Sequence, residues 1–290
     1  MGAKSALGVY LCAWTVAVSA QSIDSVLVEE FSIGAFQRAV RVVPDAEGRV
    51  FILDADQNKL FLFPDVSSAP LTLGGFGWSA GSFDKPTGVA TDGINIYVAD
   101  YGNHRIQRFD RNLNFISSLS TRDTTDAASR FGYPLDVCLS HFGDLFVLDG
   151  ENQRVLKFNP SYHLVGILGD INAGQGKLQT PNKLAVTTSR IYIGEKNRIV
   201  DFDYFGNYLG SFGEGVVSEL IGFTLLEDGL LAVSNSTLWF FSKDGVLQTT
   251  FLLSRLISGE RIDRIQDVAC NGNRLFILSS TKLHIFRLGP

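Results

Sequence analysis

The stretch that decides the fold is "IYVADYGNHRIQRFD", residues 96–110. It places four polar residues within six positions: Asp100, Asn103, His104 and Arg105. Side chains of these types can form a catalytic cluster, and they can equally hold a turn together through hydrogen bonds. An active site is needed once, whereas a structural turn is needed in every repeating unit. Copies elsewhere in the chain therefore distinguish the two interpretations.

The stretch has five copies. Two are close, "VFILDADQNKLFLF" (50–63) and "LFVLDGENQRVLKF" (145–158), and three are weaker, "IYIGEKNRIVDF" (191–202), "LLAVSNSTLWFF" (230–241) and "LFILSSTKLHIF" (275–286). All six units share an aliphatic-x-x-Phe pair: Leu60/Phe63, Ile106/Phe109, Val155/Phe158, Ile199/Phe202, Leu238/Phe241 and Leu283/Phe286. The Phe-to-Phe spacings are 46, 49, 44, 39 and 45 residues. Short apolar runs at a period near 45 are typical of β-propeller blades.

Each unit divides into four short strands, here called a to d from the start of the unit. In the second unit they are "TGVAT" (87–91), "NIYVAD" (95–100), "HRIQRF" (104–109) and "NFISSLS" (114–120), separated by turn residues. The sixth unit ends in "RLGP" and lacks strand d, while "DSVLVEEFSI" (24–33) is a spare strand. We therefore predict an all-β, six-bladed propeller whose last blade is closed by the N-terminal strand.

The first residues have the features of a secretory signal peptide. Lys4 precedes a short apolar run, residues 5–18, and small residues end with Ala20, after which cleavage is expected. An uncleaved anchor and a bacterial lipoprotein at Cys12 are the alternatives. The run is shorter than the ~20 apolar residues of a membrane span, and Leu11 is large for a lipidation site. The prediction is a signal peptide at 1–20, a single propeller domain at 21–290, and a periplasmic or extracellular location.

Composition narrows the classes of partner. The chain is 45% hydrophobic and 19% charged, which is typical of a globular protein. Removing residues 1–20 takes away one lysine and leaves 24 Lys+Arg against 30 Asp+Glu, a net charge of −6. A nucleic-acid-binding protein normally carries a basic face, so this balance argues against nucleic acid as a partner.

The segment "KPTGVATDGINIYVADYGNHRIQRFD" (85–110) resembles the NHL repeat, with Asn103-His104-Arg105 in place of the Asn-His-Leu type signature. The resemblance covers about residues 24–288. It is specific in the first three units and degraded in the last three, where Glu195, Ser234 and Ser279 replace the aspartate. It implies a six-bladed propeller, and an exported bacterial protein is the expectation. Because Asn58 and Gln153 stand in the place of His104, we interpret the opening cluster as structural turn residues rather than catalytic ones.

Two cysteines remain after residue 20. Cys138 lies in strand a of the third unit and Cys270 in strand a of the sixth. Those blades face each other across a six-fold ring, and a disulfide needs Cα atoms within ~7 Å. We therefore predict two free, buried thiols.

Candidate site residues lie at the starts of the a strands. In a propeller these strands line the axis, and the d–a connections and b–c turns share one face. The aligned positions are Arg41, Gly88, Asp136, Lys183, Ile221 (fixed only to within one residue) and Asp267. Four charges of both signs there predict a polar ring at the channel mouth that binds a small ligand or a peptide end; mutual ion pairing around a water-filled channel is the alternative.

Long loops between blades supply further candidates. Trp78, Phe83 and Tyr133 lie in or beside them, and we predict that they contact a partner. The alternative for Phe83 and Tyr133 is that they pack within the repeat.

Metal-dependent enzymes are the competing class. NHL-like amidating lyases hold zinc with several histidines near the channel, but His104, His141, His163 and His284 start none of the inner strands. A lactonase-type calcium site could draw on Asp136, Asp267, Asn182 and Gln266, with Arg41 and Lys183 unfavourably close. The sequence thus favours a non-enzymatic scaffold without cofactor or metal that binds a protein, a peptide or an envelope component. A metal-dependent hydrolase or lyase is the alternative.

Overall fold

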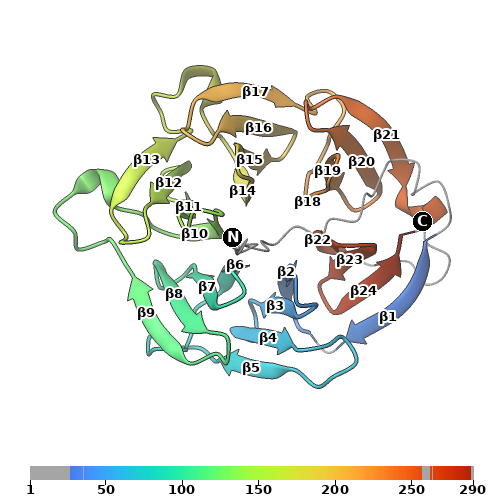
Figure 1. Ribbon diagram of the computed structural model, residues 1–290, viewed down its shortest axis with the longest axis horizontal. Helices are drawn as coiled ribbons and strands as arrows, with labels where there is room; N and C mark the ends of the chain where they lie inside the picture. The colour runs from blue at the N-terminus through green and yellow to red at the C-terminus, as the bar shows by residue number, and fades with distance from the viewer. Residues whose placement is uncertain (1–26, 35, 257–261, 263, 289–290) are drawn as a thin grey trace, which may run out of the picture.

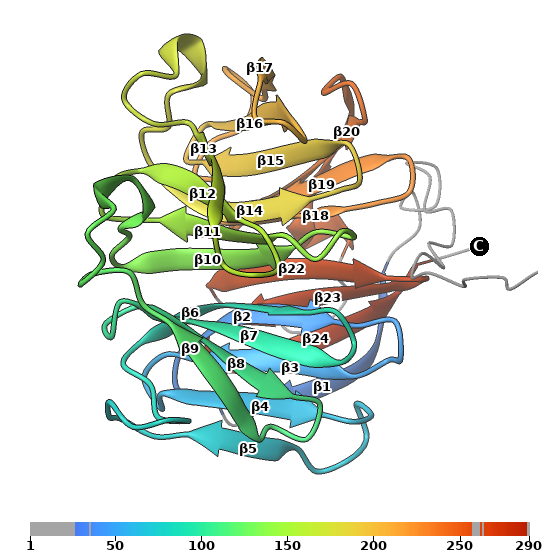
Figure 2. The same ribbon diagram turned by 60° about the vertical axis from the view of Figure 1, so that its left-hand side comes forward.

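Six four-stranded antiparallel sheets surround a central axis in the computed structural model, which describes residues 27–34, 36–256, 262 and 264–288. In Figure 1 the view runs down this axis, with β2, β6, β10, β14, β18 and β22 innermost. Figure 2 shows the blades from the side, each strand lying beside the next from the axis outward. The predicted all-β, six-bladed propeller of four-stranded blades is confirmed.

The first five blades each use four consecutive strands in order from the axis outward. Blades one and two are β2 (Ala39–Pro44), β3 (Val50–Asp54), β4 (Lys59–Phe63), β5 (Leu71–Gly74), β6 (Pro86–Thr91), β7 (Asn95–Asp100), β8 (Arg105–Asp110) and β9 (Phe115–Leu119). Blades three and four are β10 (Pro134–Leu139), β11 (Leu145–Asp149), β12 (Arg154–Phe158), β13 (Leu164–Leu168), β14 (Pro181–Val186), β15 (Arg190–Glu195), β16 (Arg198–Asp203) and β17 (Tyr208–Phe212). Blade five is β18 (Gly222–Leu225), β19 (Gly229–Val233), β20 (Thr237–Ser242) and β21 (Leu247–Leu252). Short helical segments lie in the connections: η2 (Ala127–Ser129), η3 (Gly174–Gly176) and α1 (Leu253–Leu256).

The sixth blade joins the two ends of the described chain. It contains β22 (Ile265–Asn271), β23 (Arg274–Ser279) and β24 (Lys282–Arg287), and β1 (Val28–Gly34) pairs antiparallel with β24 as its outer strand. Closure of the last blade by the N-terminal strand is therefore confirmed. The predicted signal peptide, residues 1–20, lies outside the described residues.

The aliphatic-x-x-Phe pair has a clear structural reason. Its two members lie three residues apart on strand c, so they point to opposite faces of the blade. Ile106 of blade two packs in the core between blades two and three, while Phe109 packs in the core between blades one and two. The same division holds in the other blades, for example at Leu283 and Phe286. Each blade thus needs one such pair to fill both of its interfaces, which explains the period.

Five of the six inner strands begin with an irregularity that sets the position of the candidate ring. In blades one, two, three, four and six the pairing register shifts between the first and third residues of strand a, as between Pro134 and Asp136. The third residue of strand a pairs with the residue just before the polar residue that ends strand b, as Asp136 pairs with Leu148 before Asp149. By that rule the fifth-blade equivalent is Gly222, which pairs with Val233, and not Ile221.

Among the described residues, no helix is long and apolar enough to cross a membrane.

Candidate functional site

The opening cluster holds a connection between blades. Asp100 is fully buried at the end of β7, where its Oδ1 accepts the Asp84 backbone N–H at 2.7 Å. Its Oδ2 accepts the Asn103 amide at 2.9 Å and Arg105 Nε at 2.8 Å. Burial raises the pKa of Asp100, and these hydrogen bonds act in the opposite direction. The carboxylate therefore fastens the loop that enters blade two, as expected for a structural residue.

The same arrangement recurs in the neighbouring blades. Asp54 accepts the Gln37 backbone N–H at 2.6 Å, and Asp149 accepts the Gly132 backbone N–H at 3.2 Å. Glu195 accepts the Thr180 backbone N–H at 2.9 Å. Because four blades repeat the contact, the prediction that these residues are structural agrees with the geometry.

His104 also bridges two blades. Its Nδ1 accepts the Tyr133 backbone N–H at 3.0 Å, and its ring lies 4.1 Å from the Tyr133 ring. Burial, followed by the nearby Arg122 cation, lowers the pKa of His104, so the neutral ring that this contact requires is favoured. Asn58 makes the equivalent contact in blade one, where its Oδ1 accepts the Lys85 backbone N–H at 2.7 Å.

The charged ring, Arg41, Asp136, Lys183 and Asp267, comes together at the axis. Arg41 lies 3.4 Å from Asp136 Oδ2 and 3.8 Å from Asp267 Oδ1, and Lys183 Nζ contacts Asp267 Oδ1. The exposed fractions are 6% for Arg41, 3% for Asp136 and 0% for Asp267. The ring is therefore buried within the channel, deeper than the open mouth that was predicted.

The ring has an approximate two-fold pattern. Around the axis its six positions are basic, glycine, acidic, basic, glycine, acidic: Arg41, Gly88, Asp136, Lys183, Gly222 and Asp267. A Cβ on Gly88 would lie 2.6 Å from Asp136 Oδ1, and one on Gly222 would lie 2.8 Å from Asp267 Oδ1. The absence of a side chain at both glycines therefore allows the acid of the next blade to approach.

Each ring carboxylate also ties two blades together through the backbone. Asp136 Oδ2 of blade three accepts the Leu184 N–H of blade four at 3.0 Å. Asp267 Oδ2 of blade six accepts the Val42 N–H of blade one at 3.1 Å. The two acids thus join the first three blades to the last three at both seams. This geometry supports the ion-pairing alternative for the ring, and its ligand-binding role stays a prediction.

Burial and ion pairing act in opposite directions on the pKa values of the charged ring residues. Burial raises the pKa of Asp136, and Arg41 acts against that rise. Burial lowers the pKa of Lys183, with the carboxylate of Asp267 opposing it. For Arg41 burial also acts downward, but Asp136 and Asp267 together leave its pKa raised. Mutual compensation is what allows several charges to remain in a buried position.

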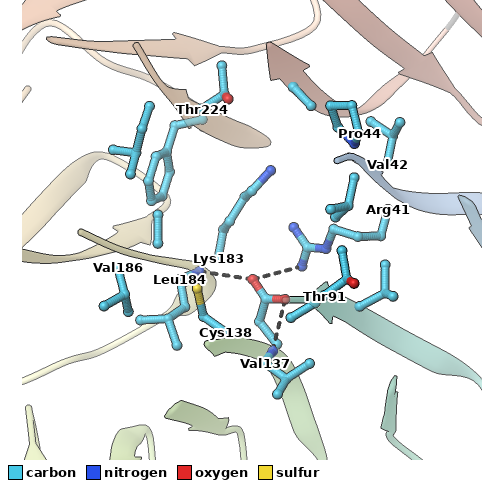
Figure 3. Close-up of a pocket in the computed structure, with 18 of the residues that line it drawn as sticks. Arg41, Val42, Pro44, Thr91, Val137, Cys138, Lys183, Leu184, Val186 and Thr224 are labelled. Atoms are coloured by element: carbon cyan, nitrogen blue, oxygen red, sulfur yellow. Dashed lines mark hydrogen bonds and ion pairs between the residues drawn. The ribbon is translucent and has the colours of Figure 1, made fainter. Parts of the chain in front are cut away.

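A cavity of about 390 Å³ lies in the channel beside the ring. It extends along the later residues of the inner strands, toward the a–b turns, and Asp136 is among the residues that line it. Figure 3 shows Arg41 and Lys183 reaching into its middle. Cys138 and Cys270 line it, and both thiols are free, as predicted. Both are only partly buried as whole residues, and burial raises the pKa of each thiol to about 12.

The loop between β5 and β6 carries exposed aromatic residues on the other face of the propeller. Trp78 is 69% exposed and Phe76 is 74% exposed. Arg105 donates to the Trp78 carbonyl at 2.8 Å, and the Asn103 amide donates to the Gly77 carbonyl at 2.8 Å. The loop is therefore fixed by the b–c turn of blade two while its aromatic side chains face solvent.

The two other predicted contact residues differ. Phe83 is fully buried and packs edge-on against Phe109 at 6.0 Å between ring centroids, so its predicted role as a contact residue is wrong. It fills the core between blades one and two. Tyr133 is 40% exposed and lies against His104 and Tyr101. Phe76 was missed by the sequence reasoning, although its position in the glycine-rich loop was a usable signal.

The four histidines are spread over blades two, three and six, and none starts an inner strand, as the sequence predicted. His141 is in the β10–β11 turn, His163 is in the β12–β13 connection, and His284 is on β24 with Nδ1 2.9 Å from Glu29 Oε1. Within the described residues no group of three or more His, Cys, Asp or Glu side chains could hold a metal ion.

Comparisons with known proteins agree with the fold. The sequence profile of the NHL repeat matches residues 83–109. Over 143 residues the chain is 29% identical to a probable peptidyl-alpha-hydroxyglycine alpha-amidating lyase of Caenorhabditis elegans, covering 48% of this chain and 40% of the relative. Over 147 residues it is 33% identical to Protein brain tumor of Drosophila melanogaster, covering 49% of this chain and 14% of the relative.

The matched region thus spans less than half of each of these relatives. Among solved structures, a streptogramin B lyase superposes with a TM-score of 0.62 at 11% identity, covering 87% of this chain and 79% of that one. Such a low identity supports the fold alone. The match at 83–109 covers β6, β7 and all but the last residue of β8, which are the three inner strands of the blade that contains the opening stretch. The protein is therefore a six-bladed β-propeller whose second blade carries a recognisable NHL repeat.

Proposed function

We propose that the protein is a non-enzymatic binding module of the cell envelope or extracellular space, and that a protein or peptide docks on its d–a/b–c face. The observation that carries this proposal is the fixed aromatic loop. Exposed tryptophan and phenylalanine side chains are frequent anchors of protein interfaces. A loop that is already ordered loses less conformational entropy on binding than a mobile one.

The hydrogen bonds within the loop support its preorganisation. Gly77 N–H donates to the Phe83 carbonyl at 3.1 Å, and Phe83 N–H donates to the Gly75 carbonyl at 2.9 Å. The Gln107 side-chain amide donates to the Ser82 carbonyl at 2.7 Å. The loop is therefore held by hydrogen bonds within itself and by a hydrogen bond from Gln107 of blade two. These contacts hold the Trp78 side chain in a fixed position on the surface.

The test uses exposed aromatic residues on opposite faces. A photocrosslinking amino acid at Trp78 should capture a discrete partner from the envelope or secreted fraction of the source cells, and the same group at Phe205, which is 88% exposed in the β16–β17 turn, should not. Trp78→Ala should weaken binding of the identified partner about tenfold or more, and Phe205→Ala should leave it unchanged. Equal capture at both positions, or a partner unaffected by Trp78→Ala, would contradict the proposal.

A lyase is the second candidate function. The similarity to an amidating lyase at 29% identity is the observation that favours it. Elemental analysis of the purified protein and an assay with a peptidyl-α-hydroxyglycine substrate, with and without EDTA, test this candidate. Stoichiometric zinc or calcium whose removal abolishes turnover would replace the binding proposal with the lyase.

A further inference from the structure

The channel cavity opens away from the aromatic loop face. Its inner end is formed by the charged ring, and its wall follows the inner strands to residues next to the a–b turns, such as Pro44, Leu139 and Val186. These three outer residues are half-buried, whereas Arg41 and Asp136 at the inner end are buried. The cavity is therefore a blind-ended site that is reached from the a–b face.

The size and lining of the cavity suit a small organic ligand. Its volume of about 390 Å³ falls within the range of roughly 300–1,000 Å³ that is common for ligand sites. Most side chains of the wall are aliphatic or aromatic, including Val43, Val89, Phe223, Leu225 and Val268. At about 30 Å³ per water-sized group, the space holds about 13 such groups. An apolar molecule of that size would bury most of its surface here.

The charged groups that line the cavity carry a net positive charge, although the four-membered ring as a whole is neutral. Arg41, Lys183 and Asp136 line it, and the fourth ring member, Asp267, does not. Two positive groups and one negative group leave 2 − 1 = +1 at the inner end. The acid that balances this charge, Asp267, is fully buried behind the wall and accepts hydrogen bonds from Val42 N–H and Lys183 Nζ.

The ring also retains a free hydrogen-bond donor. Lys183 Nζ donates to Asp267 Oδ1 and, at 3.3 Å, to the Val268 carbonyl. An ammonium group carries three N–H donors. In the described residues one of them has no partner, and Figure 3 shows Nζ extending into the middle of the cavity. An anionic group bound there would complete the hydrogen bonding of Lys183 and reduce the cost of burying it.

We propose that the channel cavity binds a small amphipathic carboxylate, with its apolar body along the inner strands and its carboxylate against Lys183 and Arg41. The ligand enters from the a–b face, so this site is separate from the docking of a partner at Trp78. The same ring that joins the two halves of the propeller thus also recognises the head group of the ligand.

Decanoate, whose dozen or so non-hydrogen atoms match the space, is the probe. Calorimetry on the chain of residues 21–290, below the concentration at which the probe forms micelles, should show one molecule bound per protein. Decanol, which has the same body without the charge, should bind about tenfold more weakly or worse. Decyltrimethylammonium should not bind. Absence of decanoate binding, or equal affinity for all three compounds, would overturn the proposal.

A pair of variants locates the site. Ala185→Phe adds a ring to the wall of the cavity and should reduce decanoate affinity at least tenfold. Thr188→Phe adds the same ring to an exposed turn of the same blade and should leave the affinity unchanged. Full decanoate affinity in a folded Ala185→Phe protein would place the ligand elsewhere and refute the proposal. If Ala185→Phe does not fold, the three-compound series on the unchanged protein decides.

Discussion

The first four blades and the last two differ in the side chain that accepts backbone hydrogen bonds at the end of strand b. Blades one to four place an acid there, and its carboxylate accepts backbone N–H groups of the loop that enters the blade. Blades five and six place Ser234 and Ser279 there. Ser234 accepts the Thr237 N–H of its own turn at 3.2 Å, and Ser279 accepts the Lys282 N–H of its own turn at 3.0 Å.

The difference shows what a buried carboxylate requires. Asp100 has four donors around it, including Arg105, whereas a serine hydroxyl needs only one or two partners. Arg105 and Arg154 are the first residues of strand c in blades two and three and pair with the aspartates, and Thr237 is the first residue of strand c in blade five. Blade five therefore lacks both the acid and the cation, whereas blade six has Lys282 at the start of strand c and lacks only the acid. Blades can lose the acid because the interblade cores, which do not depend on it, remain.

The largest effect is expected from removing β1, because one of the serine blades relies on it for closure. Deletion of residues 28–34 strips β24 of its outer partner and opens the ring. We expect a loss of at least ~4 kcal/mol in the free energy of unfolding, and a fall in Tm of about 10 °C or more by calorimetry. Deletion of residues 21–26 is the control. A Tm within a degree or two of the control would show that blade six does not need the strand.

Removing a buried acid should cost more than removing a serine. Asp100→Ala removes the carboxylate that neutralises Arg105 and accepts the Asp84 N–H, and we expect a loss of about 3–5 kcal/mol in urea unfolding. Ser279→Ala removes one hydroxyl and should cost about 1 kcal/mol. Similar losses for the two variants would mean that Asp100 and Ser279, which end strand b in their blades, contribute equally to the free energy of unfolding.

The charged ring tests coupling between the two halves of the molecule. Asp267→Asn leaves Lys183 and Arg41 undercompensated and should destabilise by about 2–4 kcal/mol. In the double variant Asp267→Asn/Lys183→Met the total loss should be clearly smaller than the sum of the two single losses. Additive losses in a double-mutant cycle measured by urea unfolding would show that the pair is not coupled.

Blade five can be converted toward the acid type. Ser234→Asp buries a carboxylate next to Thr237 rather than an arginine, and we expect a loss of about 1–3 kcal/mol. Ser234→Asp/Thr237→Arg should recover part of that loss, because it restores the acid–cation pair of blades two and three. If adding the arginine recovers nothing, the acid blades owe their stability to the entering loop rather than to the cation.

The smallest effect concerns the two thiols, one in an acid blade and one in a serine blade. Both pKa values are raised to about 12 by burial, so few thiolates are present at pH 8, and alkylation of the native protein should be slow at both. If the serine blades open more readily, Cys270 should be alkylated a few-fold faster than Cys138, as read by peptide mass spectrometry. Both should react fully in denaturant without reductant. If neither Cys138 nor Cys270 reacted in denaturant without reductant, the two would form a disulfide, which would contradict the free thiols of this structure.

The sequence alone determined the architecture, because propeller blades repeat. The aliphatic-x-x-Phe pair fixed the number and period of the blades, since each blade must fill two interfaces with side chains from one strand. The missing last strand and the spare first one fixed the closure. Repetition also identified the structural role of Asp100 and His104, because a feature present in several blades is not a single active site.

Other features depended on the tertiary structure, because they arise from contacts between residues far apart in the chain. Alignment placed Arg41, Asp136, Lys183 and Asp267 at equivalent positions, but their pairing partners and burial follow from how four inner strands meet at the axis. The position of Gly222 as the ring residue of blade five followed from its pairing with Val233, which local sequence does not encode. The burial of Phe83 and the exposure of Phe76, in one loop of similar residues, were decided by which side chain reaches the core between blades one and two.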